Sequence, residues 1–177
     1  IVRFYTICLF FIQINLMAQS RIQGEYLFRR QELVAAFNFT EDGKFQFFYS
    51  YGVADRGATG SFTIEGDTLK LKSDKEPGND FAVKKQSRSG SGYKVICKAP
   101  NPHLLSYMQC LVYVGDQMLT FESDKDGIVN IDLPHCDKIY VRNLIFPDIP
   151  TLVKDENNSN NRFEVMLLES VQQVSFK

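Results

Sequence analysis

The fold is decided by the stretch KFQFFYSY, residues 44–51. Its aromatic residues stand at every second position, at Phe45, Phe47, Tyr49 and Tyr51. Polar residues fill most positions between them, with Phe48 as the exception. Because successive side chains of a β-strand point to opposite faces, this alternation predicts a strand with one apolar face.

Similar patterns repeat outward along the chain. Short apolar alternations recur at intervals of roughly 8–12 residues, separated by Gly, Asp and Asn, which is typical of an all-β sandwich or barrel. Beyond the first twenty residues, no segment keeps the i, i+3, i+4, i+7 spacing of a long helix. Strands are expected at 24–30, 33–39, 44–51, 58–65, 68–72, 81–85, 93–98, 108–114, 117–122, 128–133, 138–146 and 162–169, with a further candidate at 173–176.

The N-terminus has the layout of a secretory signal peptide. Arg3 precedes an apolar run that ends at Leu16, and the small Ala18 precedes the polar pair Gln19-Ser20. The run is shorter than the ~20 residues of a membrane-spanning helix. We therefore expect a signal helix over 1–19, cleavage near Ala18 or Gln19, and a periplasmic or secreted product. Ser20 or Gln19 stands where a lipid-anchored protein has Cys, so no stable membrane anchor is expected.

The remaining chain is expected to form two small antiparallel β modules. Residues 87–92 are all Ser, Arg or Gly, a composition typical of a flexible connector. This places one module at 20–86, a linker at 87–92 and a second module at 93–177. The alternative is a long hairpin loop inside a single domain.

Charge and motifs narrow the range of partners. The chain has 20 Lys and Arg against 21 Asp and Glu, so there is no electrostatic reason to expect nucleic-acid binding. No cofactor motif is present, and we expect no cofactor. An envelope protein, a glycan or a small apolar ligand remain as partner classes.

Three cysteines follow the predicted signal peptide: Cys97, Cys110 and Cys136. Cys97 and Cys110 occupy core-facing positions of consecutive predicted strands. They either form a disulfide, as an oxidising compartment allows, or stay free and act as small buried hydrophobes.

Residues suited to catalysis or metal binding are few. His103 and His135 are the only histidines. His135 is followed by Cys136 and Asp137, but neighbours on a strand point to opposite faces, which disfavours a Cys–His pair. The closely spaced Cys or His pairs of zinc sites are missing. A calcium-loop reading beginning at Glu122 has Leu133 where the loop needs Glu. We therefore expect no metal site and no enzymatic activity.

A ligand site is hypothesised beside the aromatic strand. Asp55 and Arg56 lie in a predicted loop over 52–57, and loops at the mouth of a β-barrel carry polar contacts. Four aromatic residues can line a pocket with them: Phe45, Phe47, Tyr49 and Tyr51. The alternative is that this aromatic stripe is simply the core face.

Residues 24–73 contain a set of short motifs: Gly24-Glu25-Tyr26, Asp42-Gly43-Lys44-Phe45, Tyr51-Gly52-Val53-Ala54-Asp55, Gly60-Ser61-Phe62 and Gly66-Asp67-Thr68-Leu69-Lys70-Leu71. With these motifs, the segment resembles a lipocalin-like domain of exported bacterial proteins. The segment Met17-Ala18-Gln19 is similar to the ends of signal peptides in Bacteroidetes. This resemblance implies a β meander or partial barrel, and it suggests a carrier of a small apolar ligand.

The second module resembles another class. The run from Ser123 to Ile131 resembles a hairpin of transthyretin-like or carboxypeptidase-regulatory domains, which implies a β-sandwich over 93–177. Neither family implies catalysis. The expected function is a non-enzymatic exported binding or interaction protein of the bacterial envelope, with a lipocalin-like carrier as the alternative.

Overall fold

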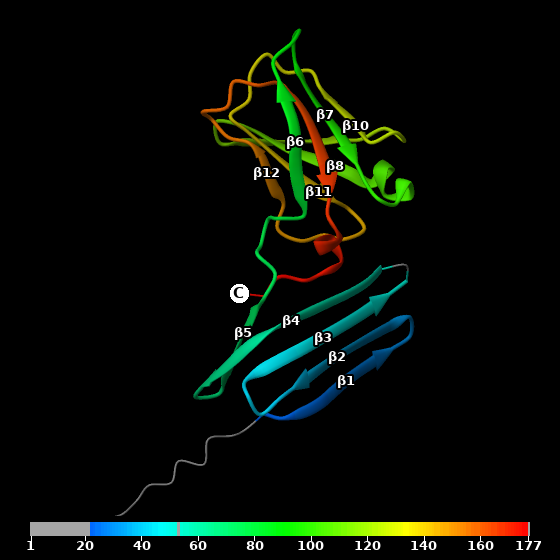
Figure 1. The fold of residues 1–177 in the computed structure, drawn as a ribbon, viewed down its shortest axis with the longest axis vertical. Coiled ribbons are helices and arrows are strands. Elements are labelled where there is room, and N and C mark those ends of the chain that lie inside the picture. The colour runs from blue at the N-terminus through cyan, green and yellow to red at the C-terminus, as the bar shows by residue number, and fades with distance from the viewer. Residues whose placement is uncertain (1–21, 53, 177) are drawn as a thin grey trace, which may run out of the picture.

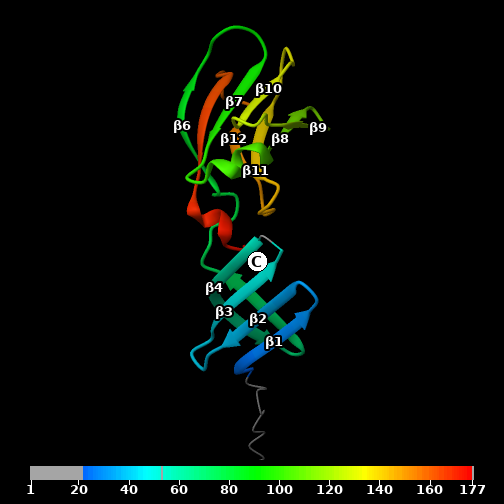
Figure 2. The same cartoon turned by 90° about the vertical axis from the view of Figure 1, so that its right-hand side faces the viewer.

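The computed structural model describes residues 22–52 and 54–176, and the predicted signal peptide over 1–19 lies outside them. The described chain is all-β, as predicted, and its sheets do not close into a barrel. A five-stranded sheet forms one body and two four-stranded sheets form a second, which are arranged end to end in Figures 1 and 2. In the part of the chain that is described, no helix is long and apolar enough to cross a membrane.

The five-stranded sheet is an antiparallel meander. Its strands follow chain order: β1 (Gly24–Arg30), β2 (Leu33–Phe39), β3 (Lys44–Tyr51), β4 (Ala54–Glu65) and β5 (Thr68–Ser73). The register sets Phe37 opposite Phe47 and Phe39 opposite Phe45, which gathers aromatic side chains on one face. β4 begins earlier than the predicted 58, because Ala54 pairs with Tyr51.

The second body is a β-sandwich. One sheet has the order β10-β7-β13-β6 and the other β12-β11-β8-β9. Their bounds are β6 (Phe81–Ser87), β7 (Tyr93–Lys98), β8 (Met108–Val114), β9 (Gln117–Glu122), β10 (Ile128–Ile131), β11 (Lys138–Asn143), β12 (Thr151–Lys154) and β13 (Arg162–Leu167), with short 3-10 helices η1 (Pro102–Tyr107) and η2 (Glu169–Gln172). β13 runs parallel to β7, a pairing that the expectation of purely antiparallel modules did not include.

The core of the sandwich lies between its two sheets. Fully buried apolar residues alternate along the strands of both sheets, including Val95, Val112, Val129, Val141 and Phe163. This alternation is the period-two pattern expected of strands with one covered face.

The predicted linker at 87–92 is wrong. β6, which precedes it, pairs with β13 and belongs to the sandwich. The loop is also fixed to the sandwich, because the Asn161 side chain donates to the carbonyls of Ser89 and Gly92 at 3.2 and 2.8 Å. Gly90 and Gly92 both have positive φ, which Gly adopts without steric cost. The run is therefore an ordered connection between β6 and β7. The two bodies are instead connected by residues 74–80.

The C-terminal segment returns to the five-stranded sheet. Figures 1 and 2 show it in red, running from the sandwich to the side of β4 and β5. The Val174 N–H donates to the Gly57 carbonyl at 2.8 Å, and the Ser73 N–H donates to the Phe176 carbonyl at 3.1 Å. The candidate strand at 173–176 therefore forms a single bridge, Gly57 to Gln173, where β5 leaves the edge of β4 uncovered.

Candidate ligand groove

A groove of about 420 Å³ opens where the five-stranded sheet meets the sandwich. Its lining comes from β3 and β4, from the β11–β12 connection and from the C-terminal segment: Phe47, Tyr49, Tyr51, Ala54, Arg56, Leu144, Ile145, Pro147, Val174 and Phe176. Four of the six predicted ligand residues are thus brought together here, and Phe45 and Asp55 are not.

Phe45 is excluded from the groove because it is a core residue. Only 1% of its surface is exposed, and the Phe176 ring lies edge-on to it at a centroid distance of 5.8 Å. The alternative that the aromatic stripe is a core face is therefore correct for Phe45 and in part for Phe47, which packs against the same core cluster.

Asp55 is excluded because it lies on a strand. It pairs with Ser50, and its neighbour Arg56 pairs with Tyr49. Adjacent strand residues point to opposite faces, so only Arg56 shares the face of the tyrosines. Because a loop was predicted over 52–57, the alternation of Asp55 and Arg56 between the two faces of the sheet was not expected.

The floor of the groove is aromatic. Phe47 stacks near Tyr49 at 6.5 Å and meets the Phe176 ring edge-on at 5.3 Å. Tyr51 is 54% exposed and stands at the mouth with the exposed Leu144. A ligand in the groove would therefore contact aromatic rings on the floor and exposed apolar side chains at the mouth.

Arg56 forms part of one wall of the groove, and its guanidinium binds groups of the protein. Its Nη1 donates to the Pro147 carbonyl and its Nη2 to the Gln173 carbonyl, both at 2.9 Å. Asp148 lies 3.7 Å from Nη2, and the Arg56 side chain is only 10% exposed. Burial lowers the pKa of Arg56, while the charge of Asp148 opposes that shift. Arg56 thus ties β4 to the sandwich and leaves the groove mainly apolar.

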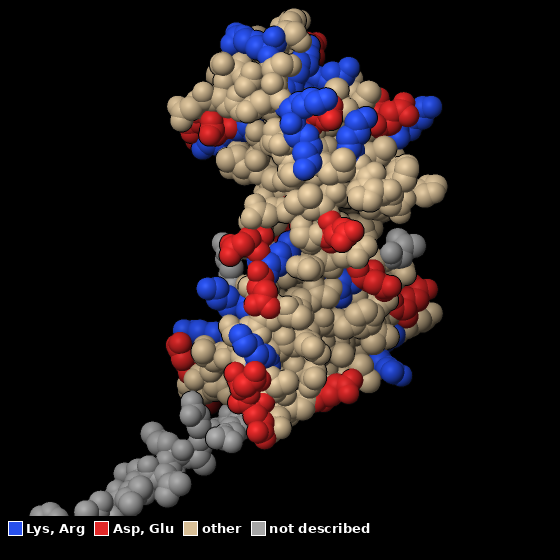
Figure 3. All heavy atoms as spheres, viewed as in Figure 1, with Lys and Arg blue, Asp and Glu red and all other residues tan. Residues whose placement is uncertain are grey.

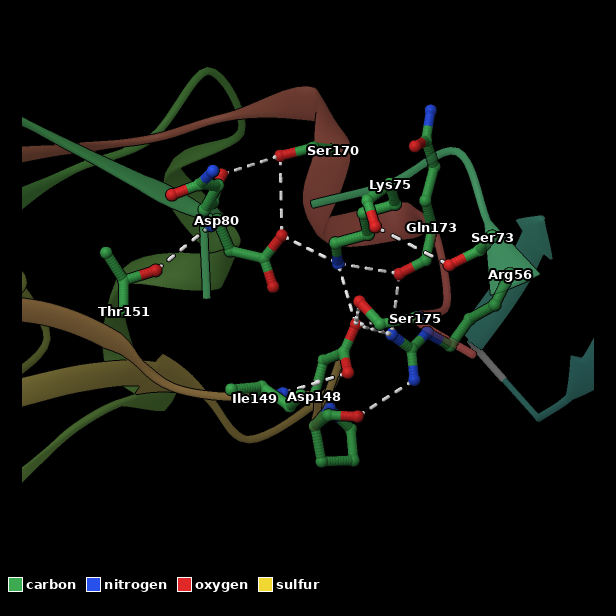
Figure 4. A network of polar contacts seen from close by, with 12 residues as sticks. Arg56, Ser73, Lys75, Asp80, Asp148, Ile149, Thr151, Ser170, Gln173 and Ser175 are labelled. Carbon is green, nitrogen blue, oxygen red and sulfur yellow. Dashed lines mark hydrogen bonds and ion pairs between the residues drawn. The ribbon is translucent and has the colours of Figure 1, made fainter. Parts of the chain in front are cut away.

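Behind this wall lies a buried ionic network, drawn in Figure 4. Lys75 Nζ lies 2.8 Å from both Asp80 Oδ1 and Asp148 Oδ2, and it donates to the Gln173 carbonyl at 2.8 Å. Burial would raise the pKa of Asp148, but hydrogen bonds from Lys75, the Ile149 N–H and Ser175 hold it below the ordinary value. The network joins the 74–80 connection, the β11–β12 connection and the C-terminal segment beside the groove.

The far wall of the groove, formed by the C-terminal segment, and the ionic network were not predicted from the sequence. Val174 and Phe176 alternate with polar residues, which is the only sequence signal that places them on an apolar face. Lys75 and Asp80 occur in a polar segment that is indistinguishable from an exposed loop. Both are buried through contacts with residues far along the chain, such as Asp148 and Thr151.

The candidate Cys97–Cys110 disulfide is not formed. Cys97, Cys110 and Cys136 are all free and buried. Burial raises the pKa of Cys97 to about 12 and that of Cys110 well above its ordinary value. These thiols fill the sandwich core as small hydrophobes, which was the alternative interpretation.

His135 pairs with a carboxylate at the surface. Its Nε2 lies 2.9 Å from Asp137 Oδ1, and the Gly115 N–H and His135 lower the pKa of Asp137. Cys136 points into the core instead, and its backbone N–H donates to the Tyr93 hydroxyl at 3.2 Å. Within the described residues, no cluster of three His, Cys, Asp or Glu side chains could hold a metal ion.

A second hollow, of about 480 Å³, lies on the opposite face of the five-stranded sheet. Its lining combines the exposed ring of Phe48 with side chains that carry hydrogen-bonding groups, among them Glu25, Asn38, Gln46 and Thr59. On the face of the protein seen in Figure 3, positive and negative side chains are interspersed.

Comparison with protein-family models, with curated proteins and with solved structures gave no match, so the lipocalin-like and transthyretin-like resemblances rest on the sequence motifs alone.

Proposed function

We propose that this protein is a non-enzymatic binding protein that holds a small, uncharged, largely apolar molecule in the groove. The observation that carries the proposal is the convergence of three separate chain segments on one aromatic-floored hollow. A volume of about 420 Å³ falls within the range of small-molecule sites. The open sheet supports binding at this junction in place of the barrel interior that a lipocalin-like carrier would use.

The character of the ligand follows from the lining. Aromatic and aliphatic side chains dominate, and the guanidinium of Arg56 already donates to two carbonyls. A charged ligand would lose hydration without gaining a free partner of opposite charge, so a neutral apolar molecule is favoured. The lining contains no nucleophile beside a base, which supports binding without catalysis.

Fluorescence of N-phenyl-1-naphthylamine, a neutral apolar probe, tests the proposal. We expect saturable binding that Tyr51→Ser weakens about tenfold, because the substitution removes one ring from the mouth. Phe48→Ser is the matched control, since Phe48 is an exposed aromatic residue of the same strand on the other face. Absence of saturable binding, or equal loss in both variants, contradicts the proposal.

A second candidate function, glycan binding, is favoured by the hollow around Phe48. An exposed aromatic ring flanked by amide and carboxylate side chains suits a sugar, whose faces are apolar and whose edges donate and accept hydrogen bonds. On a glycan array we expect Phe48→Ser to abolish binding and Tyr51→Ser to preserve it. The reverse pattern would reject this candidate.

We also propose that the protein acts in the bacterial envelope or outside the cell. The support is the signal-peptide layout of residues 1–19. Cell fractionation followed by mass spectrometry should find an extracytoplasmic product that begins near Gln19 or Ser20. A cytoplasmic product that retains residues 1–19 contradicts the proposal.

A further inference from the structure

In the part of the chain that the structure describes, β1 is an edge strand of the five-stranded sheet. It pairs with β2 through seven consecutive residue pairs, and no other strand among residues 22–52 and 54–176 pairs with it. The register has no bulge and the strand contains no Pro, so neither of these two devices blocks its edge. Its charged residues are of both signs, with Glu25 near one end and Arg29 and Arg30 at the other. Its residues Tyr26, Leu27 and Phe28 are about half exposed, at 52, 52 and 47%.

The hydrogen-bonding groups on the free edge can be assigned. Thr40 donates its N–H to the Lys44 carbonyl, so Thr40 and every second residue before it point toward β3. The residues between them, including Leu33, therefore point toward β1. Leu33 pairs with Arg30, so Arg30 and every second residue before it point toward β2. The free edge accordingly presents the N–H and C=O groups of Glu25, Leu27 and Arg29.

The sequence of β1 is complementary to itself when two copies run antiparallel. With Leu27 of each copy opposite the other, Glu25 of each faces Arg29 of the other. All three outward-pointing residues then form hydrogen-bonded pairs. On the other face, Tyr26 of each copy lies opposite Phe28 of the other, in the closer non-hydrogen-bonded positions.

We propose that β1 pairs with β1 of a second copy, which joins two five-stranded sheets into one continuous sheet across a two-fold axis at Leu27. The charge pattern favours a second copy over an unrelated strand, because both ends of the pairing gain an attractive Glu25–Arg29 contact. A shift by two residues would leave Leu27 opposite Glu25 or Arg29 and lose these contacts.

In the proposed pairing, the adjacent residues Arg29 and Arg30 have different surroundings. Arg30 lies over the Phe28 ring of its own strand, with its guanidinium carbon 5.4 Å from the ring centroid. In the proposed register it meets Gly24 of the second copy, which has no charge. Arg29 lies on the opposite face and meets Glu25.

Sedimentation equilibrium of the purified protein over a range of concentrations tests the proposal, with the sheets checked by circular dichroism. We expect the apparent mass to double as concentration rises. Glu25→Arg and Arg29→Glu should each weaken the dimer at least about tenfold, because each places like charges at both ends of the pairing. An equimolar mixture of the two variants should restore dimers, since opposite charges then meet again.

Arg30→Glu is the matched control, because it makes the same charge change on the same strand but faces no carboxylate. A dimer weakened equally by Arg30→Glu and Arg29→Glu, or not restored by mixing, contradicts the proposed register. A chain that stays monomeric at high concentration also contradicts the proposal and leaves the edge for a strand of another protein.

Amide hydrogen exchange gives a second measurement. The amides of Glu25, Leu27 and Arg29 should become protected as concentration rises, while those of Tyr26 and Phe28 are protected at all concentrations by β2. Uniform protection, independent of concentration, contradicts the proposal. Probe binding in the groove is independent of this edge, so failure of either proposal can be distinguished from failure of the other.

Discussion

Phe176, the last residue that the structure describes, packs edge-on against Phe45 in the first sheet, with ring centroids 5.8 Å apart and planes at 82°. A single sheet has an apolar face that needs a covering layer. The C-terminal segment supplies part of that layer, because Phe176 also contacts the rings of Phe37 and Phe47. The C-terminal segment thus forms part of the core of the five-stranded sheet.

We predict that Phe176→Ala destabilises the protein by about 2 kcal/mol, because removal of this partly buried ring leaves a void beside Phe37, Phe45 and Phe47. Urea unfolding followed by circular dichroism measures the loss, and hydrogen exchange should place it in the five-stranded sheet. Phe48→Ala, which truncates an exposed ring of the same sheet, should cost under about 1 kcal/mol. Equal losses in the two variants would show that the tail does not cover the sheet.

Lys75→Met should destabilise the protein by about 3–5 kcal/mol, since removing one member of a buried ionic network leaves uncompensated charge. The Lys75 side chain is 3% exposed and faces both Asp80 and Asp148. Lys70→Met is the control, because Lys70 pairs with Glu65 at an exposed site where ion pairs contribute little. Urea midpoints compare the two. A small loss in Lys75→Met would mean that the network contributes little to the stability of the fold.

Acid should destabilise the native protein through Asp148. Its pKa is lower in the folded protein than the unfolded value of about 3.9, so its stabilising contribution is complete above that value. The contribution is lost as pH falls through the lower folded pKa. Asp148→Asn should therefore show a flatter decline of unfolding free energy between about pH 5 and pH 2. Urea titrations at several pH values measure this, and parallel curves for the two proteins contradict it.

The meander could be predicted from sequence because each of its strands carries its own signal. The alternation over Lys44–Tyr51 fixes which side chains share a face, and Asp42-Gly43 and Gly66-Asp67 mark turns between neighbouring strands. Such contacts are local. They require no knowledge of how distant segments meet.

The boundary between the two bodies and the groove at their junction could not be predicted from the sequence, because both depend on contacts between residues far apart in the chain. The glycine-rich run at 87–92 has the composition of a linker, yet it is held by Asn161, far along the chain. The groove needs Pro147 and Phe176 beside Tyr49, and no local pattern brings these residues together. The alternation in the sequence predicted the aromatic floor of the groove. It did not predict that the β11–β12 connection and the C-terminal segment lie beside that floor.

Gly60→Ala should destabilise the protein by about 3 kcal/mol, because a side chain there overpacks a site enclosed by backbone. The added Cβ would overlap the Lys72 carbonyl oxygen and lie 2.7 Å from Cε1 of Phe45. Gly57→Ala on the same strand is the control, since its Cβ would meet the Phe47 carbonyl oxygen at 3.4 Å, an ordinary contact. Thermal unfolding should separate the variants clearly, and similar midpoints would show that β5 can move away from β4.

The three core thiols should resist alkylation as long as the protein is folded. Thiolate is the reactive form, and burial raises the pKa of Cys97 to about 12 and raises that of Cys110 and Cys136 as well. With iodoacetamide at about pH 8, below even the ordinary thiol pKa of about 8.5, mass spectrometry should find no adduct on these residues in the native protein. All three should react once urea unfolds the chain. A Cys97–Cys110 disulfide would instead leave both residues unmodified in urea until a reductant is added, which would contradict the free thiols of the sandwich core.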